Sequence, residues 1–106
     1  MATGLLGQSA LASATNTVVY TVPTGYFTVL SVNVLNRGTT AVSIRMALAA
    51  TSTPTNAEYI EYDVQVGANG VMERTGLMMN AGKNLVVYAS NANVSVNAFG
   101  IETSTT

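Results

Sequence analysis

Apolar and polar side chains alternate with a period of two over most of the chain, from residue 16 to residue 102. This is the period of a β-strand that buries one face and exposes the other. Near the end of the chain, Val94, Val96 and Ala98 fall on one face of such a strand and the polar Asn97 falls on the other. Turn signals rich in Gly, Pro and Asn separate the alternating stretches. The pattern predicts seven strands, within the segments 15–23, 26–38, 40–50, 57–67, 71–82, 83–91 and 92–102.

Short alternating strands of this kind predict an all-β fold, because no segment after residue 15 has a helical period. We expect an antiparallel β-sandwich of about seven strands, whose polar outer positions keep one face of each sheet in water. Jelly-roll-like connections are the favoured topology. An immunoglobulin-like order is the alternative, although the chain has neither the Cys nor the Trp of antibody domains.

Two segments allow more detailed expectations. Residues 71–82 alternate less regularly, and Gly76 within them predicts a bulge or the close approach of a neighbouring backbone. Residues 57–67 alternate sharply, so that their two faces can be assigned. The side chains expected to point inward are Ile60, Tyr62, Val64 and Val66, and those expected to point outward are Tyr59, Glu61, Asp63 and Gln65.

Residues 1–15 have neither a clear period nor a charge, and their only large apolar groups are three leucines and Met1. We interpret them as an extended N-terminal arm that becomes ordered on a neighbouring subunit, so that its removal should leave the fold intact. A frayed terminus and a short helix over residues 8–14 are the alternatives. The expected division is an arm at 1–15, a sandwich domain at 16–103 and a polar tail at 104–106.

The composition argues against several classes of partner. Of the 106 residues, 48% are hydrophobic and only 8% are charged, against roughly 25% charged in an average soluble domain. The net charge is -1 and the four basic residues are scattered, which does not favour binding to nucleic acid or to anionic lipid. No segment has the pattern of a signal peptide or of a membrane helix. A surface with so little charge resists association poorly, which suggests that neighbours cover much of it.

The side chains offer little catalytic chemistry. The absence of His and Cys excludes a Ser–His–Asp triad, a thiol nucleophile and the usual zinc ligands. Glu61 and Asp63 project together from one strand face and Glu58 precedes them. Such acids could bind calcium or act as a glycosidase pair, but they are interpreted as a solvent-facing strand surface. We therefore expect no enzymatic activity, no catalytic residue, no metal and no cofactor.

Contact with other proteins is the remaining possibility. The leucines of the arm could dock on a neighbouring subunit, and an outward arginine or tyrosine could contact a partner. The grouped methionines could form an adaptable apolar surface. The expected interface residues are Leu5, Leu6, Leu11, Arg45, Tyr59 and Met78.

Several segments together resemble small virion proteins of tailed bacteriophages. They are YTVPTGYFTVLSVNVLNRGTTAVSIRMALA at 20–49, AEYIEYDVQVGANGVMERTGLMMNAG at 57–82 and the closing ANVSVNAFGIE at 92–102. The resemblance extends from Val19 to Glu102 and concerns structural signatures, not an active site. It implies a non-enzymatic capsid decoration (cement) protein that binds the outer surface of the head and clamps neighbouring major capsid subunits.

The resemblance also implies partners and a location. The partners would be the major capsid protein and further copies of the chain, with a trimer favoured, and no nucleic acid or membrane. The protein would be made in the host cytoplasm and incorporated into the virion. A tail, neck or fibre-base component is an alternative that the resemblance leaves open. A carbohydrate-binding module for host adhesion, using a site near Glu58, Glu61 and Asp63, is a further alternative.

Overall fold

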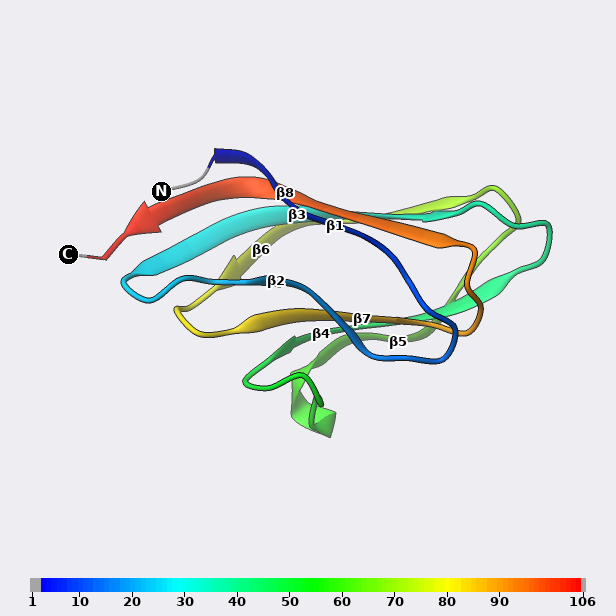
Figure 1. Cartoon of the computed structure of the whole chain (residues 1–106), viewed down its shortest axis with the longest axis horizontal. Coiled ribbons are helices and arrows are strands. Elements are labelled where there is room, and N and C mark those ends of the chain that lie inside the picture. The colour runs from blue at the N-terminus through cyan, green and yellow to red at the C-terminus, as the bar shows by residue number, and fades with distance from the viewer. Residues whose placement is uncertain (1–2, 106) are drawn as a thin grey trace.

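The computed structural model describes residues 3–105, which form eight strands and one short 3-10 turn (Figure 1). The strands are β1 (Thr3–Ala10), β2 (Thr17–Thr21), β3 (Tyr26–Asn36), β4 (Val42–Ala49), β5 (Tyr59–Val66), β6 (Val71–Met79), β7 (Asn84–Ala89) and β8 (Val94–Ser104), and the 3-10 turn is η1 (Asn56–Glu58). The expectation of an all-β chain is confirmed.

The strands form two four-stranded sheets in which all neighbours are antiparallel. Sheet A has the order β1-β8-β3-β6, and sheet B has the order β2-β7-β4-β5. Only β4 and β5 are consecutive in the chain and also lie in the same sheet, so every other connection passes from one layer to the other. The two layers lie face to face in a sandwich-like arrangement (Figure 1).

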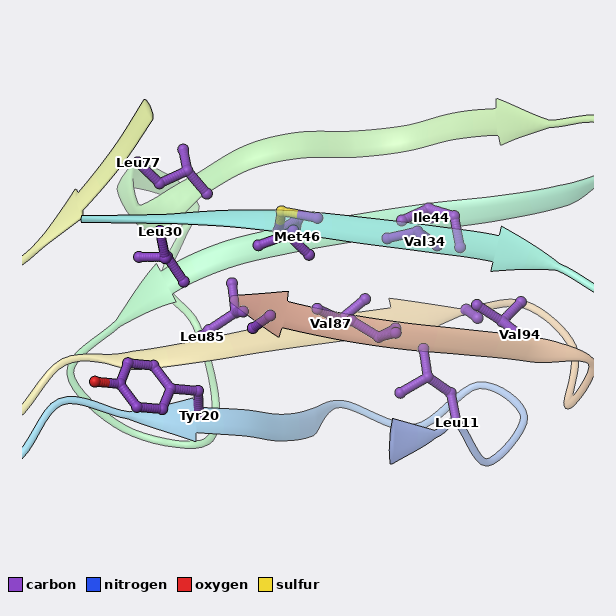
Figure 2. Packing of buried hydrophobic residues seen from close by; sticks show 14 of the residues in the cluster. Leu11, Tyr20, Leu30, Val34, Ile44, Met46, Leu77, Leu85, Val87 and Val94 are labelled. Carbon is purple, nitrogen blue, oxygen red and sulfur yellow. The ribbon is translucent and has the colours of Figure 1, made fainter. Parts of the chain in front are cut away.

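The core lies between the two sheets and consists of the inward side chains that the alternation predicts. Sheet A contributes Leu30, Val32 and Val34 from its long central strand β3. Sheet B contributes residues such as Ile44 and Val87, which meet them from the opposite layer (Figure 2). β-branched and leucine side chains fill this kind of layer well, because they are stiff and carry no polar atom.

The expected count of seven strands was wrong, because an eighth strand lies in the segment expected to be an arm. β1 pairs with β8 from Thr3↔Ile101 to Ala10↔Ser95 and forms an edge of sheet A. Its glycines and small side chains interrupt the apolar alternation, which concealed the strand in the sequence. At the other end of the chain β8 continues to Ser104, so the polar tail also begins within a strand.

Each of the four edge strands carries an irregularity in its register. The shifts lie between Leu5 and Gly7 in β1 and between Val18 and Tyr20 in β2. In β6 the shift falls opposite Ser31, where Gly76 has a φ of 69°, so the bulge expected at this glycine is confirmed.

The first of two register shifts in β5 overturns two expected side-chain directions. Val64 pairs with Ile44 and Glu61 pairs with Met46, so two residues of β5 lie opposite one residue of β4. The extra residue is accommodated at Asp63, whose φ of 54° is unusual for a residue other than glycine. The alternation therefore changes phase, and Tyr62, expected to be inward, is 56% exposed. Glu61, expected to be outward, lies on the same face as its partner Met46, a core residue, and bonds to Arg74 of the opposite sheet.

Candidate functional site

A group of aromatic and charged side chains lies on the outer face of sheet B. The guanidinium carbon of Arg45 lies 4.4 Å from the centre of the Tyr62 ring and 4.7 Å from that of the Tyr88 ring. Arg45 Nε also donates a hydrogen bond of 2.7 Å to Oδ1 of Asp63. The bulge in β5 makes this group possible, because it places Tyr62 and Asp63 together opposite Arg45. We call Arg45, Tyr62, Asp63 and Tyr88 the arginine cluster.

Contacts within the chain hold the side chain of Arg45 in the arginine cluster. The hydrogen bond with Asp63 is the main reason why the pKa of Arg45 is raised. The guanidinium of Arg45 therefore keeps its positive charge. Cation–π contacts with the two rings restrict the guanidinium further. The rings of Tyr59 and Tyr62 also meet edge to face, with ring centres 5.0 Å apart.

The hairpin between β4 and β5 covers the adjoining part of the outer face of sheet B. Ala47, Ala49 and Val86 point outward from this sheet and are nevertheless buried, with Tyr59 packed against them. The hairpin loop and η1 project on this side of the molecule (Figure 1). One part of the outer face of sheet B is thus covered by the hairpin, and the adjoining part exposes the arginine cluster.

The outer face of sheet A has an exposed apolar surface at the end where β8 finishes. Ile101 lies opposite Val29, and Val29 lies opposite Met78 on the next strand. In the adjoining row, Phe99 lies opposite Leu5. We call Leu5, Val29, Met78, Phe99 and Ile101 the apolar patch, and its members extend over all four strands of the sheet.

A shallow hollow lies further along the same face, between β1 and β8. It has a volume of about 390 Å³, and Gln8 Nε2 donates a hydrogen bond of 2.7 Å to Oδ1 of Asn97 within it. Its other lining residues are Ser9, Ala10, Ser95 and Val96, so it contains no charged side chain.

The three acids considered for calcium or sugar do not converge. Glu61 accepts a hydrogen bond of 2.6 Å from Arg74, and Asp63 belongs to the arginine cluster. Glu58 accepts from the backbone N–H groups of Thr55 and Ala50, and these bonds lower its pKa. Within residues 3–105, no three His, Cys, Asp or Glu side chains are grouped so that they could hold a metal ion.

Sequence reasoning missed one buried polar group. Glu102 is only 5% exposed and Thr28 is fully buried. Glu102 Oε2 accepts a hydrogen bond of 2.5 Å from the hydroxyl of Tyr20, which lies 2.8 Å from the hydroxyl of Thr28. Burial and the bond to Glu102 raise the pKa of Tyr20 to about 12. The carboxylate is buried and bonded to a tyrosine of the opposite sheet, so we interpret it as a structural group of the core.

The residues expected at an interface fall into three places. Leu5 and Met78 belong to the apolar patch, and Arg45 and Tyr59 both contact Tyr62 on sheet B. Leu11 is 2% exposed and Leu6 packs against the same core, so these two leucines stabilise their own domain and do not stand free for a neighbouring subunit.

Both outer faces therefore carry side chains of the kinds that are common in protein interfaces. The arginine cluster joins a charge to two aromatic rings, and the apolar patch offers large side chains whose burial removes apolar surface from water. Tyr62, Tyr88, Val29, Phe99 and Ile101 were not expected at an interface. The outward phase of alternation in β3 and β8 could have identified Val29, Phe99 and Ile101.

No protein-family model, curated protein or solved structure matches the chain. None of the described residues forms a helix long and apolar enough to cross a membrane.

Proposed function

We propose that this chain is a non-enzymatic structural protein of a bacteriophage virion, a capsid decoration protein on the outer surface of the head. In this role it clamps neighbouring major capsid subunits and contacts further copies of itself. The observation that carries the proposal is that both outer faces of the two-sheet domain present groups suited to protein contact. A domain with two such faces can lie between neighbouring protein subunits, whereas a monomeric protein needs no contact face.

The connectivity supports a jelly-roll topology, which is common in viral capsid domains. The first strand pairs with the last, β2 pairs with β7, β3 pairs with β6 and β4 pairs with β5. A long antiparallel hairpin wound around a barrel axis gives this order. An immunoglobulin-like order would place the first two strands side by side in one sheet, but β1 and β2 lie in different sheets.

We assign the arginine cluster to the contact with the capsid. Tyrosine and arginine are enriched among the residues that dominate interface energies. Because the Arg45 side chain is already held by two rings and one carboxylate, its binding would cost little ordering entropy.

The location of the protein tests this proposal first. Purified virus particles would be separated into heads and tails, and the chain would be quantified in each fraction. Hundreds of copies on heads support the decoration role. A few dozen copies on tails would favour a tail, neck or fibre-base component, and absence from both fractions would overturn a virion role.

A binding assay with stripped heads tests the assigned contact. Tyr62→Ala removes an exposed ring and should weaken binding by about tenfold or more, as expected for a dominant interface residue. Gln65→Ala is the matched control, because it truncates another exposed side chain of β5. Equal binding by the two variants, with both folded by circular dichroism, would contradict the assignment.

A further inference from the structure

The apolar patch on sheet A is a large exposed surface for a domain of this size. Met78 is 66% exposed, Leu5 57% and Ile101 53%, with Val29 and Phe99 beside them. From these fractions the five side chains expose roughly 500 Å², in the upper range for the largest apolar patch of a typical monomer. Patches of this size are often functional, whereas single exposed apolar residues are ordinary.

The rows that contain the patch carry no charged side chain. The residues paired with patch members on neighbouring strands are Thr3, Ser31 and other members of the patch. Within these rows a second copy of the chain would therefore bring no like charges together, and Glu73, opposite Asn33 on the same face, lies outside them. An uncharged apolar surface can therefore bind an identical surface on a second copy, because no electrostatic repulsion opposes the contact.

The size of the patch fits the centre of a self-contact. A stable interface needs about 800 Å² on each partner, with an apolar centre and a polar rim. Polar side chains that adjoin the patch on the same face, such as Ser31, Asn33 and Asn97, can supply the rim.

Other parts of the molecule are less suited to pairing with a second copy. All four edge strands carry a register shift, and such bulges twist an edge so that it pairs poorly with another strand. The hairpin between β4 and β5 covers part of the outer face of sheet B. The outer face of sheet A remains as the side with exposed apolar residues on all four strands.

We propose that two copies of this chain pack through the apolar patch, sheet against sheet, about a two-fold axis. In aligned sheet packings the strand directions differ by about 30°. When the same patch is used on both chains, the assembly is complete with two copies. We therefore propose a dimer in place of the trimer expected from the resemblance. The inference deepens the proposed function by naming the self-contact, and it leaves the arginine clusters of the two copies directed outward.

Light scattering on the purified protein during size-exclusion chromatography tests the pairing, with no particle present. The wild type should have twice the mass of one chain. Met78→Glu should raise the dissociation constant of the dimer by about tenfold or more, because it places an unpaired charge in an apolar contact. Val71→Glu is the matched control, since Val71 is also an exposed residue of β6, 54% exposed, but lies outside the patch. It should leave the dimer unchanged.

Ile101→Thr keeps a β-branched residue in β8 and should also weaken the dimer, which provides a second test if Met78→Glu does not fold. A wild type that stays monomeric at its highest soluble concentration would overturn the pairing. A trimer, or a dimer that Met78→Glu and Ile101→Thr leave intact, would overturn it too. These outcomes concern the self-contact alone, whereas absence from heads and tails would overturn the proposed function.

Discussion

The hydroxyl of Tyr20 donates a hydrogen bond of 2.5 Å to Oε2 of Glu102, which lies 82 residues further along the chain. Tyr20 belongs to β2 in sheet B and Glu102 to β8 in sheet A, so the bond joins the two layers through the core. The Tyr20 hydroxyl has a single proton, so the Thr28 hydroxyl is the donor in their bond of 2.8 Å. Within the described residues, every buried side-chain nitrogen and oxygen has a hydrogen-bond partner.

Replacing Tyr20 with phenylalanine should destabilise the fold. The ring would remain in the core, but the carboxylate of Glu102 would lose a buried donor. Loss of one partner of a buried polar group costs about 1–3 kcal/mol, and more when the group is charged. We expect the free energy of unfolding, measured with urea, to fall by about this amount.

Tyr88→Phe is the control for this change, because it removes a hydroxyl on the outer face of sheet B and keeps the ring beside Arg45. Its effect should be within about 0.5 kcal/mol of zero, as for most surface substitutions. If the two variants lose equal stability, the bond between Tyr20 and Glu102 does not stabilise the fold.

Stability should also fall in strong alkali, in a range fixed by Tyr20. Its pKa rises from 10.0 to about 12 on folding. Between these two values the unfolded chain releases the phenolic proton and the folded chain keeps it, so the unfolded state gains relative stability. Below pH 10 the contribution is complete, and it is lost by pH 12, with a total on the order of 2 kcal/mol.

Urea unfolding at pH 9 and pH 11 would measure this dependence. The wild type should lose more stability between the two values than Tyr20→Phe does, because the variant lacks the titrating group. Both proteins contain the other four tyrosines, so the difference between them isolates Tyr20. Parallel losses would show that the pKa of Tyr20 does not change on folding.

The face of a strand could be predicted from the sequence wherever the alternation was uninterrupted. Val94, Val96 and Ala98 are buried as expected, and so are Leu30 and Val32. Tyr62 and Glu61 were assigned to the wrong faces because a bulge reverses the phase, and the φ of 54° that permits it at Asp63 leaves no mark in the sequence. β1 was missed because an edge strand with two glycines needs no apolar alternation.

The candidate contact residues were predictable only in part, for a related reason. The outward directions of Arg45 and Tyr59 follow from local alternation, so both were identified. The stacking of Arg45 between Tyr62 and Tyr88 depends on which strands become neighbours, and the order β7-β4-β5 is not contained in any local pattern. The burial of Glu102 likewise depends on a partner from a distant strand.

Val96→Asp should unfold the domain. Val96 is 1% exposed in the central part of the core, and burial of an unpaired carboxylate costs several kcal/mol, against a total stability of roughly 5–15 kcal/mol. Asn97→Asp introduces the same carboxylate at the next residue, on the outer face, and should remain folded. Circular dichroism and solubility distinguish the two cases. A soluble, native-like Val96→Asp protein would mean that the faces of β8 are reversed.

Removal of residues 1–15 should destabilise the domain, contrary to the expectation for a free arm. The deletion takes away β1 and the buried Leu11, and it leaves β8 as an unpaired edge of sheet A. Loss of Leu11 alone corresponds to about 2–5 kcal/mol, and the exposed edge favours aggregation. A thermal melt and the soluble fraction would measure both effects. A truncated chain as stable and soluble as the full chain would restore the interpretation of this segment as an arm.

Gly100 lies in β8 at a point where the neighbouring backbone leaves no room for a side chain. A Cβ at this position would lie 2.1 Å from the carbonyl oxygen of Val29 and 2.7 Å from the Cα of Leu30. Both atoms belong to β3, which is bonded on both sides and cannot move away freely. Gly100→Ala should therefore lower the free energy of unfolding by about 3 kcal/mol, at the upper end of overpacking effects.

Gly67→Ala is the matched control, because a Cβ there meets no atom within 4 Å. It should be neutral or slightly stabilising, since alanine restricts the unfolded chain more than glycine does. Urea unfolding gives the free energy of unfolding of both variants. It compares the same replacement of glycine by alanine at a crowded strand position and at an open turn position. Equal stabilities would mean that β3 and β8 do not approach as closely as their register requires. The pairing of Val29 with Ile101 in the apolar patch would then be in doubt as well.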